Sequence, residues 1–90
     1  MKDRHGNEVA IGDMVRVLEI DQGLLDWLPA DELPHTLAML NNEYLIEEFP
    51  EDGKASVTHW WQEAPGQSAC TGLYLLAHEF ELVKKAGSTG

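Results

Sequence analysis

Two short apolar segments near the ends of this 90-residue chain constrain its fold more than any other feature. The first, residues 9–18, contains the turn Gly12-Asp13 followed by alternating apolar side chains. The second, residues 75–83, passes through a predicted 3₁₀ turn at 77–79 into Phe80-Glu81-Leu82-Val83. A tight turn that opens onto period-two alternation is typical of a strand. We therefore predict that these segments are the first and last strands of one small β-domain.

The chain between these segments divides into a helical part and a β part. Residues 21–42 carry leucines at helical spacing, and Asp21 and Asp31 are the predicted N-caps of two short helices. Residues 43–62 predict a hairpin around the turn at 50–53, and residues 70–75 predict a further strand after a loop at 63–68. The order predicts a mainly β fold, α+β by count of elements, with a helical insertion between the first and second strands.

This order of elements resembles the SH3-like small β-barrel. The resemblance is carried by Ile11-Gly12-Asp13-Met14-Val15-Arg16-Val17, by the Asp52-Gly53 turn and by Glu79-Phe80-Glu81-Leu82-Val83. It extends to small bacterial barrels that open with a Gly-Asp-x-Val-x-Val segment, and to the β-subunit barrel of nitrile hydratase. It implies a five-stranded SH3-like barrel, and it transfers no catalytic residue because these barrels do not share one.

A chain of this length makes one domain. We predict a flexible N-terminus at 1–7, the barrel at 8–84 with its helical insertion at about 21–42, and a flexible tail at 85–90.

The formal net charge of −10 is the strongest compositional signal. Between Val17 and Gly53 there is no Lys or Arg, whereas acidic side chains recur throughout that stretch. Such a surface repels phosphate backbones and anionic membranes, so we predict neither nucleic-acid nor membrane binding. A basic protein partner would be attracted to it. The single cysteine, Cys70, permits no intramolecular disulfide. That favours a reducing compartment and predicts a cytoplasmic protein, and the resemblance implies one of bacterial type.

The residues best suited to metal binding or catalysis are His59, Cys70 and His78, which adjacent strands could bring together. No pair of them has the close spacing of a zinc site. Cys70 with His59 as its base would lack an oxyanion hole and an orienting third group. We predict no metal, no cofactor and no catalytic residue.

The run His59-Trp60-Trp61 places two indoles on opposite faces of one predicted strand. One indole can enter the core. The other lies outside the barrel unless the insertion covers it through its leucine stripe of Leu33, Leu37 and Leu40, and Trp27 is a candidate for the same cluster. An exposed indole on a small barrel is typical of a groove for proline-rich or extended segments.

The preferred hypothesis is a non-enzymatic protein-interaction module. Trp60 or Trp61 would anchor a protein partner, and the acidic hairpin would steer it through Glu47, Glu48, Glu51 and Asp52. One alternative is an accessory subunit or domain of an enzyme complex, which predicts a larger and flatter apolar interface. Another is a small-molecule or metal-binding sensor, which requires a pocket between the helices and the barrel. The sequence leaves the oligomeric state open.

Overall fold

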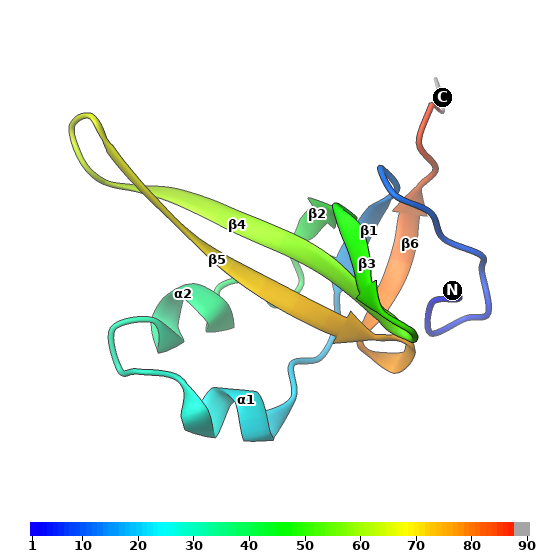
Figure 1. Ribbon diagram of the computed structural model, residues 1–90, viewed down its shortest axis with the longest axis horizontal. Coiled ribbons are helices and arrows are strands. Elements are labelled where there is room, and N and C mark those ends of the chain that lie inside the picture. Colours follow the sequence, from blue (N-terminus) through cyan, green and yellow to red (C-terminus); the bar gives the residue numbers. More distant parts are fainter. Residues whose placement is uncertain (88–90) are drawn as a thin grey trace.

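The computed structural model describes residues 1–87 and has a mainly β architecture, which confirms the predicted fold class (Figure 1). Two short helices lie between the first and second strands, as predicted. In chain order the elements are β1 (Met14–Val17), α1 (Gln22–Trp27), α2 (Leu33–Leu37), β2 (Glu43–Leu45), β3 (Glu48–Glu51), β4 (Lys54–Ala64), β5 (Gln67–Leu76), the 3₁₀ turn η1 (Ala77–Glu79) and β6 (Phe80–Lys84).

The strands form two antiparallel sheets, ordered β2-β1-β6 and β3-β4-β5. The described residues thus contain six strands in two sheets, rather than the five strands of a closed barrel that the sequence predicted. The difference arises where the predicted second strand bends. Ile46 N donates to Asp13 O at 2.9 Å in the first sheet, and Glu47 N donates to Ser56 O at 2.8 Å in the second. One segment therefore serves both sheets and is divided into β2 and β3.

A long ribbon of β4 and β5 projects from the body of the molecule (Figure 1). Its pairing runs from Lys54↔Leu76 to Ala64↔Gln67. The predicted loop at 63–68 is wrong, because the strands are joined by Pro65-Gly66 alone. Gly66 has a φ of 77°, a conformation that glycine adopts without a steric penalty. β3 pairs only with the base of the ribbon, as far as Glu48↔Ser56, so the outer part of the ribbon is two strands wide.

The core lies between the two sheets and is lined by alternate residues of their strands. Phe80 of β6 is paired with Val17 of β1, and both are fully buried. Met39, just after α2, closes one side of the core. The buried apolar residues are Val9, Val15, Val17, Met39, Ile46, Ala55, Val57, Leu73, Leu75 and Phe80.

Of the two N-caps predicted for the helical insertion, the structure confirms one. Asp21 caps α1 by accepting from Leu24 N at 3.1 Å, as predicted. The predicted cap at Asp31 is wrong: α2 has Glu32 at its N-cap without a side-chain hydrogen bond, and Pro34 lies in its first turn. Asn41 ends the insertion at a φ of 65°, the left-handed conformation expected there.

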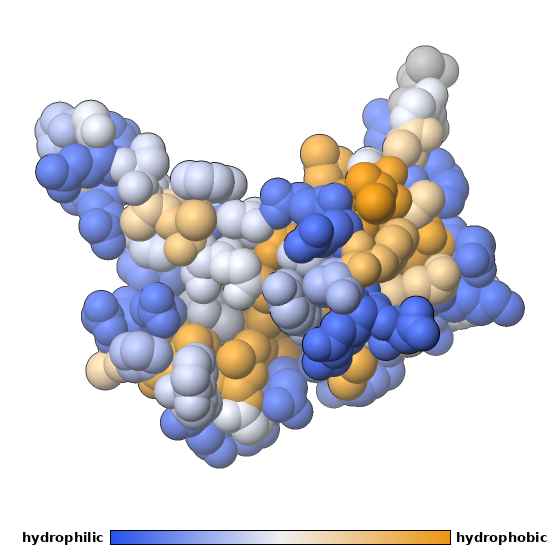
Figure 2. Space-filling model, viewed as in Figure 1, coloured by the Kyte–Doolittle hydropathy of each residue, from blue (hydrophilic) through white to orange (hydrophobic). Residues whose placement is uncertain are grey.

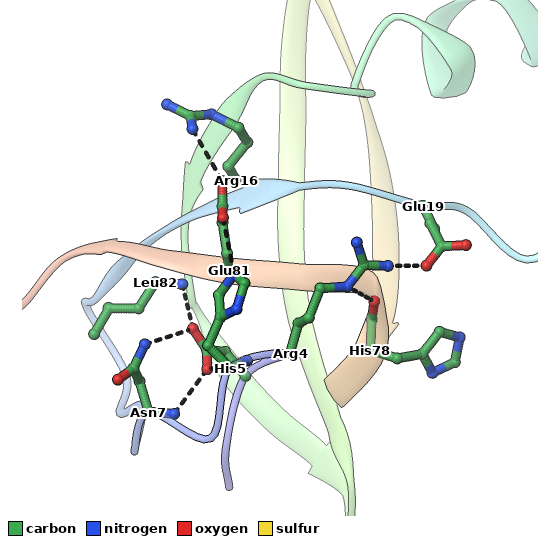
Figure 3. A network of polar contacts seen from close by, with 9 residues as sticks. Arg4, His5, Asn7, Arg16, Glu19, His78, Glu81 and Leu82 are labelled. Atoms are coloured by element: carbon green, nitrogen blue, oxygen red, sulfur yellow. Dashed lines mark hydrogen bonds and ion pairs between the residues drawn. The ribbon is translucent and has the colours of Figure 1, made fainter.

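The N-terminal segment is bound to the last strand, a set of contacts that the prediction of a flexible terminus did not anticipate. Arg4 N donates to Phe80 O at 3.0 Å, and the buried carboxylate of Asp3 accepts from Leu82 N. Figure 3 shows His5 and Arg16 on either side of Glu81. The hydrogen bond from His5, together with that from Arg16, lowers the pKa of Glu81 despite partial desolvation.

The start of the predicted C-terminal tail also has partners. Lys85 Nζ and Ala86 N each donate to Asp13 at 2.7 Å. The last three residues of that predicted tail, 88–90, lie outside the described residues.

Candidate functional site

The two neighbouring tryptophans of β4 lie on opposite faces of the sheet, as the sequence predicted. Trp61 shares its face with the buried Val57 and is half-buried, whereas Trp60 is 65% exposed on the other face. We call the face that carries Trp60 the outer face. Of these two indoles, Trp60 is therefore the accessible one.

Trp61 is covered by the helical insertion, but through a histidine rather than the predicted leucines. The ring of His35 on α2 stacks on Trp61 with centroids 3.8 Å apart and an interplanar angle of 10°. His59 stacks on the same indole at 5.7 Å, and Tyr44 Oη lies 3.3 Å from His59 Nδ1. Burial raises the pKa of Tyr44.

The predicted leucine stripe is wrong because α2 has only five residues and ends at Leu37. Leu40 lies beyond the helix and packs against the core, while Leu37 is exposed.

We expect His35→Ala to expose Trp61. The stacked ring would leave a gap over the indole that water can fill, and the lost contact costs about 1 kcal/mol of unfolding free energy. The measurement is tryptophan emission and acrylamide quenching, made in a Trp27→Phe/Trp60→Phe background so that Trp61 alone reports. His35→Phe is the matched control and should preserve the protected emission. Identical quenching of Trp61 in the parent and in His35→Ala would contradict the stacking.

Small side chains form the surface of the outer face beside Trp60. Trp60 lies directly opposite Cys70, and Thr58 lies opposite Gly72. Farther along, Tyr74 lies opposite Ser56 and is 52% exposed. At about 3.3 Å per residue, the two aromatic side chains stand about 13 Å apart along the strands. They bound a shallow surface whose floor offers little steric obstruction.

The four acidic residues predicted to bind a partner lie in two separate parts of the surface. Glu48 is paired with Ser56 on the outer face, and the carboxylate of Glu47 accepts a hydrogen bond from the Thr58 hydroxyl, two residues from Trp60. Glu51 instead pairs with Lys54 Nζ at 3.3 Å. Since Lys54 lies six positions before Trp60 on β4, Glu51 is about 20 Å away along the strand.

Asp52 lies in the hairpin turn beside Glu51, and both residues line a separate hollow of about 520 Å³ with Phe49 and Pro50. The site that the structure assembles therefore contains Trp60 with Glu47 nearby, and Glu48 at the end of the surface where Tyr74 lies. It does not contain Trp61, Glu51 or Asp52.

A second hollow, of about 470 Å³, adjoins the outer face between α1 and β5. Its lining combines apolar and charged groups: Asp21, Leu24, Lys54, Gly72, Tyr74, Leu76 and Glu79. Figure 2 shows apolar residues at the surface in this region. Sequence reasoning missed Gly72 and Tyr74. The alternation of side chains along β5 indicates that Gly72 and Tyr74 share one face. It does not indicate that this is the face of Trp60 until the pairing of β5 with β4 is known.

The structure does not bring together the residues that the sequence singled out as candidates for metal binding or catalysis. Because His59 faces the core and Cys70 lies opposite Trp60, their side chains are on different faces of the ribbon. Among residues 1–87 no group of three or more His, Cys, Asp or Glu side chains is placed to hold a metal ion. Within the same residues, no helix has the length and apolar character needed to cross a bilayer.

No protein-family model, curated protein or solved structure matches this chain.

Proposed function

We propose that this chain is a non-enzymatic interaction module that binds an extended, basic segment of a protein partner on the outer face of β4 and β5. The observation that carries the proposal is the exposure of Trp60 beside a floor of small residues, Thr58, Cys70 and Gly72. A large exposed indole is the residue type that most often supplies binding energy at an interface. Tyr74 would supply a second aromatic contact at the far end of the same surface.

The charge of the surface favours a basic segment over a neutral or acidic one. Glu47 borders the outer face near Trp60, Glu48 borders its other end near Tyr74, and residues 18–53 contain no Lys or Arg. The net charge of −10 adds long-range attraction for a cationic partner. A Lys or Arg side chain placed over the Trp60 ring would gain about 0.5–2 kcal/mol from the cation–π interaction.

We expect Trp60→Ala to lose the partner, at least tenfold in retained amount, when the tagged chain captures proteins from a lysate of its source organism. Retained proteins are identified and quantified by mass spectrometry. The matched control is Trp27→Ala, which removes an indole that is 79% exposed on α1, outside the proposed surface. A partner retained equally by the parent chain, Trp60→Ala and Trp27→Ala would reject the proposal. Retention should also fall as salt is raised.

The proposed architecture is an SH3-like one, in which the two sheets are the two halves of a barrel. Its support is the bent segment 43–51, which contributes β2 to one sheet and β3 to the other. The 3₁₀ turn η1, which connects β5 to β6, also occupies the position that the resemblance implies.

A second candidate function, an accessory subunit of an enzyme complex, is favoured by an apolar patch on the opposite sheet. Leu45 and Val83 on the outside of the β2-β1-β6 sheet are 52% and 41% exposed, and Ile11 before β1 is 58% exposed. Figure 2 shows apolar residues gathered over these strands. Leu45→Glu in the same capture experiment separates the two candidates, because a partner lost on Leu45→Glu and kept on Trp60→Ala belongs to this patch.

A further inference from the structure

The unpaired edge of β5 can be assigned from a hydrogen bond on the other side of its sheet. Ser56 O accepts from Glu47 N, so the backbone of Ser56 points from β4 toward β3. The N–H and C=O of one strand residue point to the same side, and successive residues alternate. Even-numbered residues of β4 therefore bond away from β5, and odd-numbered residues bond toward it.

The pairing of β4 with β5 then shows which residues of β5 direct their backbone groups away from β4. The partners of the even-numbered β4 residues direct their backbone groups away from β4, toward the free edge; they are Ser68, Cys70, Gly72, Tyr74 and Leu76. Leu76 fits this assignment, because its N–H donates to Glu79 Oε1 at 2.8 Å and not to β4. In the part of the chain that the structure describes, no other strand pairs with β5 on this side.

This edge lacks the devices that normally protect an exposed strand. Natural edge strands carry charged residues, proline or bulges that prevent pairing with another chain. β5 is ten residues long and contains no charged residue and no proline, although 24% of the chain is charged. Apart from a register shift beyond Gln62, near the tip of the ribbon, this edge is long, neutral and regular, which suits it to accept an additional strand.

The edge also opens into a space that fits an extended chain. Gly72 and Tyr74, two of the edge residues, line the 470 Å³ hollow together with Asp21 and Leu24 of the α1 region. Lys54 is the one base in the lining, and its ammonium group is paired with Glu51. A backbone inserted between α1 and β5 would thus meet unpaired backbone groups on one side and an acidic helix end on the other.

We propose that an extended segment of a partner protein, with Lys or Arg at alternate positions, binds as an added strand on the free edge of β5. This inference rests on the proposed function and specifies its binding mode. Only Cys70 and Gly72 separate the edge from Trp60 on the outer face, so a long basic side chain of the added strand passes over them to the indole and to Glu47. A second copy of this chain is a poorer occupant, because two chains of charge −10 repel.

The test uses a synthetic ten-residue peptide of alternating lysine and valine, labelled with fluorescein and titrated with the protein at low salt. Two further peptides carry N-methyl groups on all the valines or on all the lysines. In an added strand only one of these two sets directs its N–H groups at β5. We expect one N-methylated peptide to bind at least about tenfold more weakly, and the other to bind about as well as the parent, because each lost hydrogen bond costs about 1 kcal/mol.

Variants of Gly72 provide the matching change in the protein. Gly72→Pro removes an edge N–H and should weaken binding by about tenfold while leaving the β4–β5 pairing intact. Gly72→Ala changes the same residue but keeps the edge N–H, and its Cβ meets no protein atom nearer than Val57 O at 3.9 Å, so it should weaken binding less than Gly72→Pro. Circular dichroism and thermal unfolding check the fold of both variants. If Gly72→Pro does not fold, the peptide pair decides alone.

Equal affinity of the two N-methylated peptides would overturn strand addition, and so would the absence of binding by the parent peptide at about 1 mM. Either result concerns only the binding mode. Loss of a captured partner on Trp60→Ala would still support the proposed function, and its retention would reject that function whatever the peptides do.

Discussion

Replacing Asp13 by Ala should lower the free energy of unfolding by about 3 kcal/mol, because it removes a carboxylate that joins the two ends of the chain. The side chain of Asp13 is only 1% exposed. It accepts from Ala10 N at 2.8 Å, and from Ala86 N and Lys85 Nζ at 2.7 Å. Alanine leaves these three donors without their acceptor. Urea denaturation followed by tryptophan fluorescence measures the loss.

Two variants separate the role of the Asp13 hydrogen bonds from a general effect of lost charge. Asp31→Ala removes an exposed carboxylate and should change the stability by no more than about 0.5 kcal/mol. Asp13→Asn keeps one acceptor oxygen but loses the charge opposite Lys85, so its effect should be intermediate. A loss below about 1 kcal/mol for Asp13→Ala would show that the carboxylate does not hold the ends together.

The same carboxylate gives the stability a defined dependence on pH. Burial alone raises the pKa of Asp13, but hydrogen bonds from Lys85, Ala86 and Ala10 outweigh it and lower the pKa below its ordinary value of 3.8. The stabilisation is therefore fully present above about pH 4 and is lost as the pH falls through the lower folded-state pKa. Unfolding free energies measured between pH 2 and 6 should fall toward acid in the parent chain, and less steeply in Asp13→Asn.

The strands could be predicted because their signals are local. Alternating side chains and the Pro50–Gly53 turn lie within a few residues of the backbone they determine, and Gly53 has the positive φ of 80° that its turn requires. The N-cap at Asp21 was predictable for the same reason. The length of the β4–β5 ribbon was underestimated, because Pro65-Gly66 is typical of loops as well as of a two-residue connection.

What could not be predicted depends on partners far apart in the sequence. The bend between β2 and β3 follows from Ile46 bonding to Asp13 in one sheet and Glu47 to Ser56 in the other. No local pattern distinguishes such a segment from a continuous strand. In the candidate site, alternation separated Trp60 from Trp61, but only the three-dimensional packing of His35 shows which indole is covered. The spacing of acidic residues along the hairpin likewise gave no sign that Glu51 pairs with Lys54.

Asp3→Ala should lower the unfolding free energy by about 2–3 kcal/mol, an effect that a flexible N-terminus could not produce. The Asp3 side chain accepts from His5 N at 2.9 Å, from the backbone and side chain of Asn7 at 2.8 and 3.2 Å, and from Leu82 N at 2.7 Å, 79 residues away. Burial raises the pKa of Asp3, but these hydrogen bonds outweigh it and lower the pKa overall, so the stabilisation is lost only in acid.

The measurement that checks Asp3 pairs denaturation with amide hydrogen exchange at Leu82. Losing the acceptor should speed exchange at this amide and leave exchange at the buried Val57 in step with the global stability. Asn7→Ala is the matched control, because it removes one of the donors but keeps the Asp3 bond to Leu82. Unchanged stability and unchanged exchange at Leu82 in Asp3→Ala would mean that the Asp3 carboxylate contributes nothing to the fold. The contacts of Asp3 and Arg4 with β6 instead tie this segment to the last strand.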